Sequence, residues 1–101
     1  MHNGLDIAAP KGNRVIAPAL GIVTDVRYDL DLGRMVAIDH GYGRVTRFGH
    51  MSRQAVRVGQ QVTRGQVVGY VGSTGQSTGP HVHYEIRING IPVDPTRYIV
   101  N

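Results

Sequence analysis

Cysteine is absent from this 101-residue sequence, which excludes disulfide bonds and thiolate ligands, so any bound metal must rely on histidine and carboxylate. Tryptophan is also absent and phenylalanine occurs once, so the interior must be built mainly from valine, isoleucine, alanine and tyrosine. No apolar run approaches the roughly 20 residues of a membrane-spanning helix, and the N-terminus shows no charged leader followed by an apolar stretch. We expect no membrane span in this chain.

Lysine occurs only once, and most of the positive charge is carried by ten arginines, giving a formal net charge of +4 against seven acidic residues. Such a diffuse positive charge suits a polyanionic partner. The sequence has no basic block, no aromatic platform for stacking bases and no nucleic-acid-binding motif, so we expect no nucleic-acid partner. An anionic cell-wall polymer is compatible with the same charge.

A chain of 101 residues can form a single domain with one modest core. Its 14 glycines favour turns, its β-branched residues favour strands, and no segment has a sustained helical period. Two Gly-Gln pairs, at 59–60 and 65–66, and the dipeptide Asn89-Gly90 predict tight hairpins. We predict an all-β domain of about eight to ten short strands, of which the clearest are 15–17, 21–28, 35–39, 44–50 and 81–88.

The segment 81–88 has the pattern most suggestive of chemistry. In a strand, alternate side chains share a face, so this segment has an apolar face and a polar one, the latter formed by His81, His83, Glu85 and Arg87. Residues two apart along a strand are separated by about 6.6 Å, near enough for two imidazoles to act on one metal ion and its water. Taken alone, a His-x-His pair is more often ordinary surface polarity.

His2 and Asp6 also have residue types that bind metals. An extended chain would place them on the same side but about 13 Å apart, so they could share one ion only if the chain bends. Gly4 lies between them and permits a bend at low steric cost. On its own, this segment is better explained by an aspartate that caps a turn and an unrelated terminal histidine.

The remaining two histidines are expected to differ in role. His50 lies at the end of the predicted strand 44–50, on the same alternating positions as Phe48 and beside a loop, where functional groups are common. His40 lies in the predicted hairpin connection 40–43, and we expect it to be structural or exposed to solvent.

The segments that contain His2 and Asp6, His50, and His81 and His83 occur in this order along the chain. In this respect the sequence closely resembles the LytM/lysostaphin-type zinc endopeptidases of bacterial cell-wall metabolism. The resemblance extends over nearly the whole chain. It implies an antiparallel β-sandwich of short strands, of the duplicated hybrid motif type, with a groove that holds one zinc. The matching motifs are His-x-Gly-Leu-Asp-Ile-Ala-Ala-Pro at 2–10, the two Gly-Gln pairs, Ser-Thr-Gly at 73–75, Ser-Thr-Gly-Pro-His-Val-His-Tyr-Glu at 77–85, and Val-Asp-Pro at 93–95.

By this resemblance, His2, Asp6 and His83 are the ligands of one Zn²⁺ per chain, and His50 and His81 are the catalytic histidines. Spacing alone does not decide which of His81 and His83 binds the metal. Three protein ligands leave the fourth tetrahedral position open, as catalytic zinc sites do.

The implied reaction is hydrolysis of a peptide bond in peptidoglycan by a water molecule that zinc activates. We assign His81 as the general base and expect His50 to hydrogen-bond the oxyanion or share the acid–base work. Glu85 and Asp94 are candidates to accept hydrogen bonds from the ligand imidazoles.

One departure from the family pattern is that only Met1 precedes the first ligand, where members carry further chain. We therefore expect a single peptidase domain, residues 1–101, excised from a longer secreted protein. The resemblance implies an extracytoplasmic location in the periplasm, in the cell envelope or outside the cell. The bond that is cleaved, polyglycine bridge or D-amino-acid cross-link, and the oligomeric state are left open.

Two other functions are compatible with parts of the sequence. A non-catalytic LytM-like module would bind the cell wall or a partner enzyme, but such modules typically lack one or more ligands, and here all five positions are filled. A biotinyl or lipoyl carrier would explain the paired Gly-Gln turns around 58–66, but it needs a modifiable lysine at a hairpin tip. Lys11, the single lysine, has no such setting.

Overall fold

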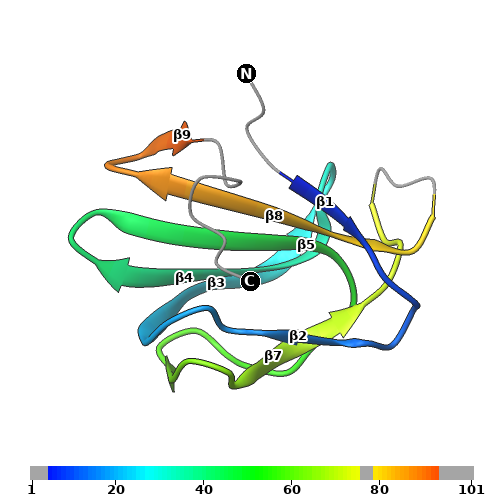
Figure 1. Ribbon diagram of the computed structural model, residues 1–101, viewed down its shortest axis with the longest axis horizontal. Helices are drawn as coiled ribbons and strands as arrows, with labels where there is room; N and C mark the ends of the chain where they lie inside the picture. The colour runs from blue at the N-terminus through cyan, green and yellow to red at the C-terminus, as the bar shows by residue number, and fades with distance from the viewer. Residues whose placement is uncertain (1–4, 76–78, 94–101) are drawn as a thin grey trace.

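The computed structural model describes residues 5–75 and 79–93 (Figure 1). Within these ranges the chain forms nine strands and no helix, which confirms the predicted all-β class. No helix among these residues could therefore cross a membrane. The strands are β1 (Leu5–Ala8), β2 (Arg14–Ile16), β3 (Gly21–Asp29), β4 (Gly33–Gly41), β5 (Arg44–Gln54), β6 (Gln61–Val62), β7 (Val67–Val71), β8 (His81–Ile88) and β9 (Ile91–Val93).

All strand pairs are antiparallel, in the order β1-β8-β5-β4-β3-β6, with β2 and β7 joined to this path through β5 and β9 through β8. Strand β5 changes partner along its length. Its first part, Arg44 to Gly49, pairs with β8, whereas Met51 to Gln54 pairs with β7. The change of partner lets β7 and β2 fold over one face of the main sheet, as Figure 1 shows.

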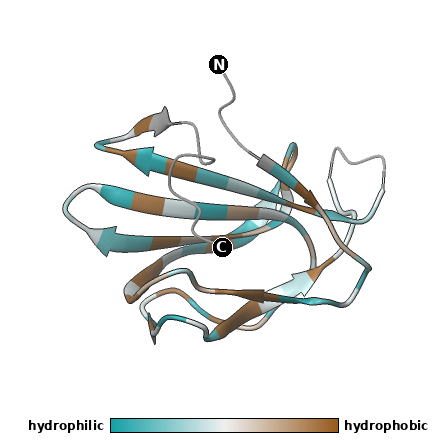
Figure 2. Ribbon diagram, viewed as in Figure 1, coloured by the Kyte–Doolittle hydropathy of each residue, from teal (hydrophilic) through white to brown (hydrophobic). Residues whose placement is uncertain are grey.

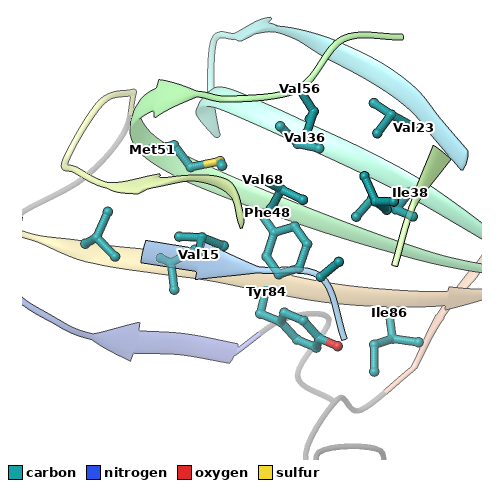
Figure 3. Packing of buried hydrophobic residues seen from close by; sticks show 14 residues of the cluster. Val15, Val23, Val36, Ile38, Phe48, Met51, Val56, Val68, Tyr84 and Ile86 are labelled. Carbon is teal, nitrogen blue, oxygen red and sulfur yellow. The ribbon is translucent and has the colours of Figure 1, made fainter. Parts of the chain in front are cut away.

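The main core lies between these two layers and is filled by small aliphatic side chains and one aromatic pair. Ring centroids of Phe48 and Tyr84 are 5.1 Å apart in a tilted arrangement. Figure 3 shows this pair surrounded by Val15, Val68 and other buried residues of the cluster. Brown, hydrophobic segments lie between hydrophilic ones along β8 (Figure 2), and its apolar face, Val82, Tyr84 and Ile86, is buried in this core, as predicted.

Two hairpins are closed by residues with left-handed backbone conformations. The β4–β5 hairpin turns at Tyr42 and Gly43, and the β8–β9 hairpin at Asn89 and Gly90, all with positive φ, which is typical of two-residue type I′ turns. The second confirms the prediction from Asn89-Gly90. The first corrects the prediction for His40: because only two residues are needed for the turn, His40 lies within strand β4.

The two Gly-Gln pairs form turns but not hairpins. In each turn the glutamine side chain accepts a hydrogen bond from the backbone N–H three residues earlier, Gln60 from Arg57 at 3.2 Å and Gln66 from Thr63 at 3.1 Å. The strands that these turns join do not pair with each other, because β6 pairs with β3 and β7 pairs with β2 and β5. The local signal predicted the turns correctly, whereas the pairing partners are distant in sequence.

The β3–β4 turn packs against the loop that follows β7, with room only for glycine at the contact. A Cβ atom added to Gly33, which has φ +65°, would lie 2.4–2.6 Å from atoms of Thr74. A Cβ on Gly75, with φ +75°, would lie 2.4 Å from the backbone nitrogen of Gly33. This backbone-to-backbone contact fixes the position of residues 73–75 next to the β4–β5 strand pair.

Gly33→Ala should therefore destabilise the fold more than an alanine at another glycine with positive φ. The matched control is Gly12→Ala, because Gly12 has φ +92° and open space around its Cβ position. We expect about 1 kcal/mol from backbone strain at Gly12 and roughly 3 kcal/mol or more at Gly33, where steric overlap is added, measured by chemical denaturation. Equal losses for the two variants would contradict the close contact between the loops.

Candidate active site

Pairing of β1 with β8 brings together two predicted metal ligands that are 77 residues apart. In the antiparallel register, Asp6 lies opposite His83, and its Oδ1 is 2.8 Å from His83 Nδ1. Leu5 to Ala8 continues straight along β8, so Asp6 reaches the site by strand pairing. His2, the third predicted ligand, and Asp94 lie outside the described residues.

His81 lies on the same face of β8, two residues before His83. Its Nδ1 is 2.7 Å from the carbonyl oxygen of Gly79. A carbonyl oxygen only accepts hydrogen bonds, so Nδ1 carries the proton, and in the neutral ring Nε2 is the basic nitrogen. This Nε2 is 3.7 Å from Asp6 Oδ1, which directs it toward the Asp6–His83 pair.

His50 joins the same cluster through a local change in backbone conformation. Its ring centroid lies 4.7 Å from that of His81 and 6.0 Å from that of His83. Strict alternation would have placed His50 on the core face with Phe48. Instead, His50 has φ 60° at the point where β5 leaves β8, and its backbone N–H donates to the carbonyl of Leu32. The left-handed conformation breaks the alternation and turns the ring toward the histidines of β8.

The His50 ring is itself held by a hydrogen bond. Nδ1 donates to the carbonyl oxygen of Thr74 at 2.6 Å, so in the neutral ring Nε2 is again the basic nitrogen. The residue is only 5% exposed, which restricts the ring to this position. His50 and His81 thus share one arrangement, with Nδ1–H bound to a backbone carbonyl.

Glu85 holds the other side of His83. Its Oε2 is 3.2 Å from His83 Nε2, while its Oε1 contacts two guanidinium groups, Arg87 Nε at 3.3 Å and Arg47 Nη1 at 3.6 Å. Glu85 is buried, and burial would raise its pKa, but the hydrogen bond from His83 and the charges of Arg47 and Arg87 outweigh this effect and lower the pKa. Glu85 therefore stays ionised and accepts from His83.

The same contacts shift the pKa values of His83 and Asp6. The hydrogen bond with Glu85 raises the pKa of His83, against the opposing effect of burial, and Asp6 adds to the increase. The hydrogen bond from His83 is the main cause that lowers the pKa of Asp6. In the metal-free chain, the two flanking carboxylates therefore stabilise the protonated form of His83, one at each ring nitrogen.

The donor atoms fit a zinc ion, although two ligands alone do not make a site. Among residues 5–75 and 79–93, no group of three or more histidine, cysteine or acidic side chains has the geometry of a metal site. The described pair contributes one carboxylate oxygen and one imidazole nitrogen, donors that zinc accepts. The carboxylate at the second ring nitrogen of His83 is the usual partner of a metal-binding histidine.

His40 lies apart from this cluster. Its Nδ1 is 2.9 Å from the carbonyl oxygen of Leu20 and its Nε2 is 2.8 Å from Thr46 Oγ1. Both ring nitrogens therefore have structural partners. Thr46 lines a surface pocket together with Tyr84 and Ile86, which belong to the core face of β8.

Sequence reasoning missed two residues that hold the cluster. Arg47 could have been found, because a strand 44–50 paired with 81–88 places it opposite Glu85. Thr74 contributes a backbone carbonyl, which no residue type encodes.

The sequence profile of peptidase family M23 matches residues 1–95, and the chain belongs to this family. Among curated relatives, it is 47% identical over 95 residues to the DD-carboxypeptidase/endopeptidase Mpg of Neisseria meningitidis serogroup B, covering 94% of this chain and 22% of Mpg. It is 44% identical over 93 residues to the peptidoglycan DD-endopeptidase ShyA of Vibrio cholerae, covering 92% of this chain and 22% of ShyA. The chain thus spans about a fifth of these relatives.

Solved structures support the same grouping. The catalytic domain of lysostaphin from Staphylococcus simulans has a TM-score of 0.91 at 30% identity, covering 97% of this chain and 78% of that domain. A zinc-containing peptidase from Vibrio cholerae has a TM-score of 0.89 at 40% identity, covering 92% of this chain and 29% of that protein. The resemblance to the LytM/lysostaphin type is confirmed, and the family to which the chain belongs is one of peptidases.

In the metal-free chain, His83 should titrate above the ordinary histidine pKa of about 6.5, and Glu85→Gln should lower its pKa. Because the folded-state pKa is raised, the stability that protonated His83 contributes is fully present below about pH 6.5 and is lost as pH rises through the raised value. NMR titration of the imidazole carbon-bound protons measures the pKa, and denaturation at several pH values measures the stability.

Asp25→Asn is the matched control, because it removes a carboxylate on β3, which lies three strands from β8 in the sheet. It should leave the His83 titration unchanged. A His83 pKa that does not respond to Glu85→Gln would contradict the proton-sharing geometry.

Proposed function

We propose that this chain is a zinc-dependent endopeptidase domain that hydrolyses peptide cross-links or stem peptides of bacterial peptidoglycan. One observation carries the proposal: Asp6 and His83 meet at 2.8 Å, and the rings of His50 and His81 gather around them. The relative ShyA is named a peptidoglycan DD-endopeptidase, and a similar solved structure is a zinc-containing peptidase. Both names support the substrate class and the metal for this chain.

Asp6 and His83 would hold the zinc together with His2, which the family resemblance supplies. When bound, zinc polarises a carbonyl and makes a water nucleophile available at neutral pH. Glu85 accepts from Nε2–H of His83, so Nδ1 of the same ring, which faces Asp6, is the nitrogen that carries the lone pair once the extra proton leaves.

The two other histidines would move protons. His81 has its proton on Nδ1, so Nε2 can take a proton from the attacking water, which makes it the general base. His50 also carries its proton on Nδ1, which donates to the carbonyl of Thr74. Its Nε2 can donate a hydrogen bond to an oxyanion only after taking up a proton, so His50 would either stabilise that charge in this way or share the acid–base work.

Peptidoglycan as substrate implies that the domain works outside the cytoplasm, in the periplasm, the envelope or the medium. The domain would form part of a longer secreted protein. The net charge of +4 suits an anionic wall. The alternative, a non-catalytic LytM-like module that binds the cell wall or a partner, would need neither zinc nor the two catalytic histidines.

Three histidine variants test the proposal together. Wild type should bind about one zinc per chain, with a higher melting temperature in zinc than after chelation, because a site formed by distant segments exists only in the folded chain. His83→Ala should lose zinc. His81→Ala should keep zinc while its peptidoglycan hydrolysis falls by about 10²–10⁴, the usual contribution of a general base. Metal analysis, calorimetry and chromatography of released peptides measure these quantities.

His40→Ala is the matched control, because it removes a histidine whose ring is bonded to Leu20 and Thr46, apart from the cluster, and it should retain both zinc and hydrolysis. Loss of zinc in His81→Ala would show that the two roles on β8 are exchanged or shared. A wild-type chain without zinc-dependent stabilisation would favour the non-catalytic module. Identification of the new peptide termini then shows which bond is cleaved.

A further inference from the structure

The position of His50 depends on a neighbouring loop more than on its own strand. The backbone N–H donates to Leu32 in the β3–β4 turn, and the ring Nδ1–H donates to the carbonyl of Thr74 at 2.6 Å. Thr74 lies in the loop after β7, three residues beyond the end of that strand at Val71. The orientation of the ring is therefore only as well defined as the position of the Thr74 carbonyl.

The side chain of Thr74 fixes that carbonyl. Its hydroxyl accepts a hydrogen bond from the backbone N–H of Arg34 at 3.1 Å and donates one to the carbonyl of Met51 at 2.7 Å. Arg34 and Met51 are facing partners of β4 and β5, next to an irregularity in that ladder. The hydroxyl thus bridges a donor and an acceptor of two strands, immediately beside His50.

We propose that Thr74 is a positioning residue for His50: its hydroxyl holds the loop against β4 and β5, and its carbonyl then sets the tautomer and orientation of the His50 ring. Valine has nearly the shape of threonine but can make neither hydroxyl hydrogen bond. Thr74→Val would leave Arg34 N–H and Met51 C=O without this partner and release the carbonyl from its place. The consequence for hydrolysis rests on the proposed function, whereas the consequence for the ring does not.

The ring is tested first in the metal-free chain, without substrate. In wild type, the ¹⁵N–¹H NMR signal of the His50 Nδ1–H should be visible, because a hydrogen bond protects it from exchange with water. Thr74→Val should broaden or remove this signal, and Thr74→Ser, which restores the hydroxyl, should recover it. Thr46→Val is the control, because it also removes a hydroxyl bonded to a histidine, but at His40.

Hydrolysis is tested second. Misplacing a catalytic group or losing the partner that orients it typically costs about 10- to 100-fold, so Thr74→Val should lower kcat by roughly that factor with little change in KM or zinc content. Thr74→Ser should recover kcat, and Thr46→Val should lose stability but keep kcat. If Thr74→Val fails to fold, Thr74→Ala carries the same expectations.

The inference is overturned if the wild-type signal is absent, if Thr74→Val retains it, or if Thr74→Ser is as impaired as Thr74→Val. It is also overturned if Thr46→Val lowers kcat as much as Thr74→Val does. A chain that gives the expected NMR result but hydrolyses no peptidoglycan would contradict the proposed function and leave the role of Thr74 in holding the ring intact.

Discussion

The structure depends on the pairing of β8 with β1 on one side and β5 on the other. Because side chains alternate along a strand, this one register places Val82, Tyr84 and Ile86 in the core and His81, His83 and Glu85 on the opposite face. A slip by one residue would exchange the two sets, exposing the apolar side chains and burying the charged ones. Burial of the core face therefore specifies the position of the polar cluster on the opposite face of the strand.

In the polar cluster, one nitrogen of each histidine ring is held by a defined hydrogen-bond partner. Backbone carbonyls of Gly79 and Thr74 bind the Nδ1–H groups of His81 and His50, and Glu85 binds Nε2 of His83. These partners select the nitrogens that face the centre. The left-handed backbone at His50 departs from regular strand geometry, and the surrounding loops hold it in place.

Much of the fold could be predicted, because the alternation in 81–88 and the turn residues at Asn89-Gly90 are local signals. The grouping of Asp6 with His83 required the family resemblance, since nothing near residue 6 specifies that its partner lies on β8. His50 was predicted at a strand end, but its orientation depends on a backbone conformation and on the Thr74 carbonyl, neither of which follows from residue type. The Gly-Gln pairs show the same limit, since they specify turns but not strand partners.

The central proposal is that this chain would bind a zinc ion through Nδ1 of His83 and the carboxylate of Asp6. A crystal structure of the zinc-loaded chain, with anomalous diffraction collected at the zinc absorption edge, tests it most directly. The account predicts one peak at bonding distance, about 2.0–2.2 Å, from His83 Nδ1 and an Asp6 oxygen, with Glu85 still on Nε2 and no bond to His81 or His50. A peak bonded to His83 Nε2 or to His81 would contradict it.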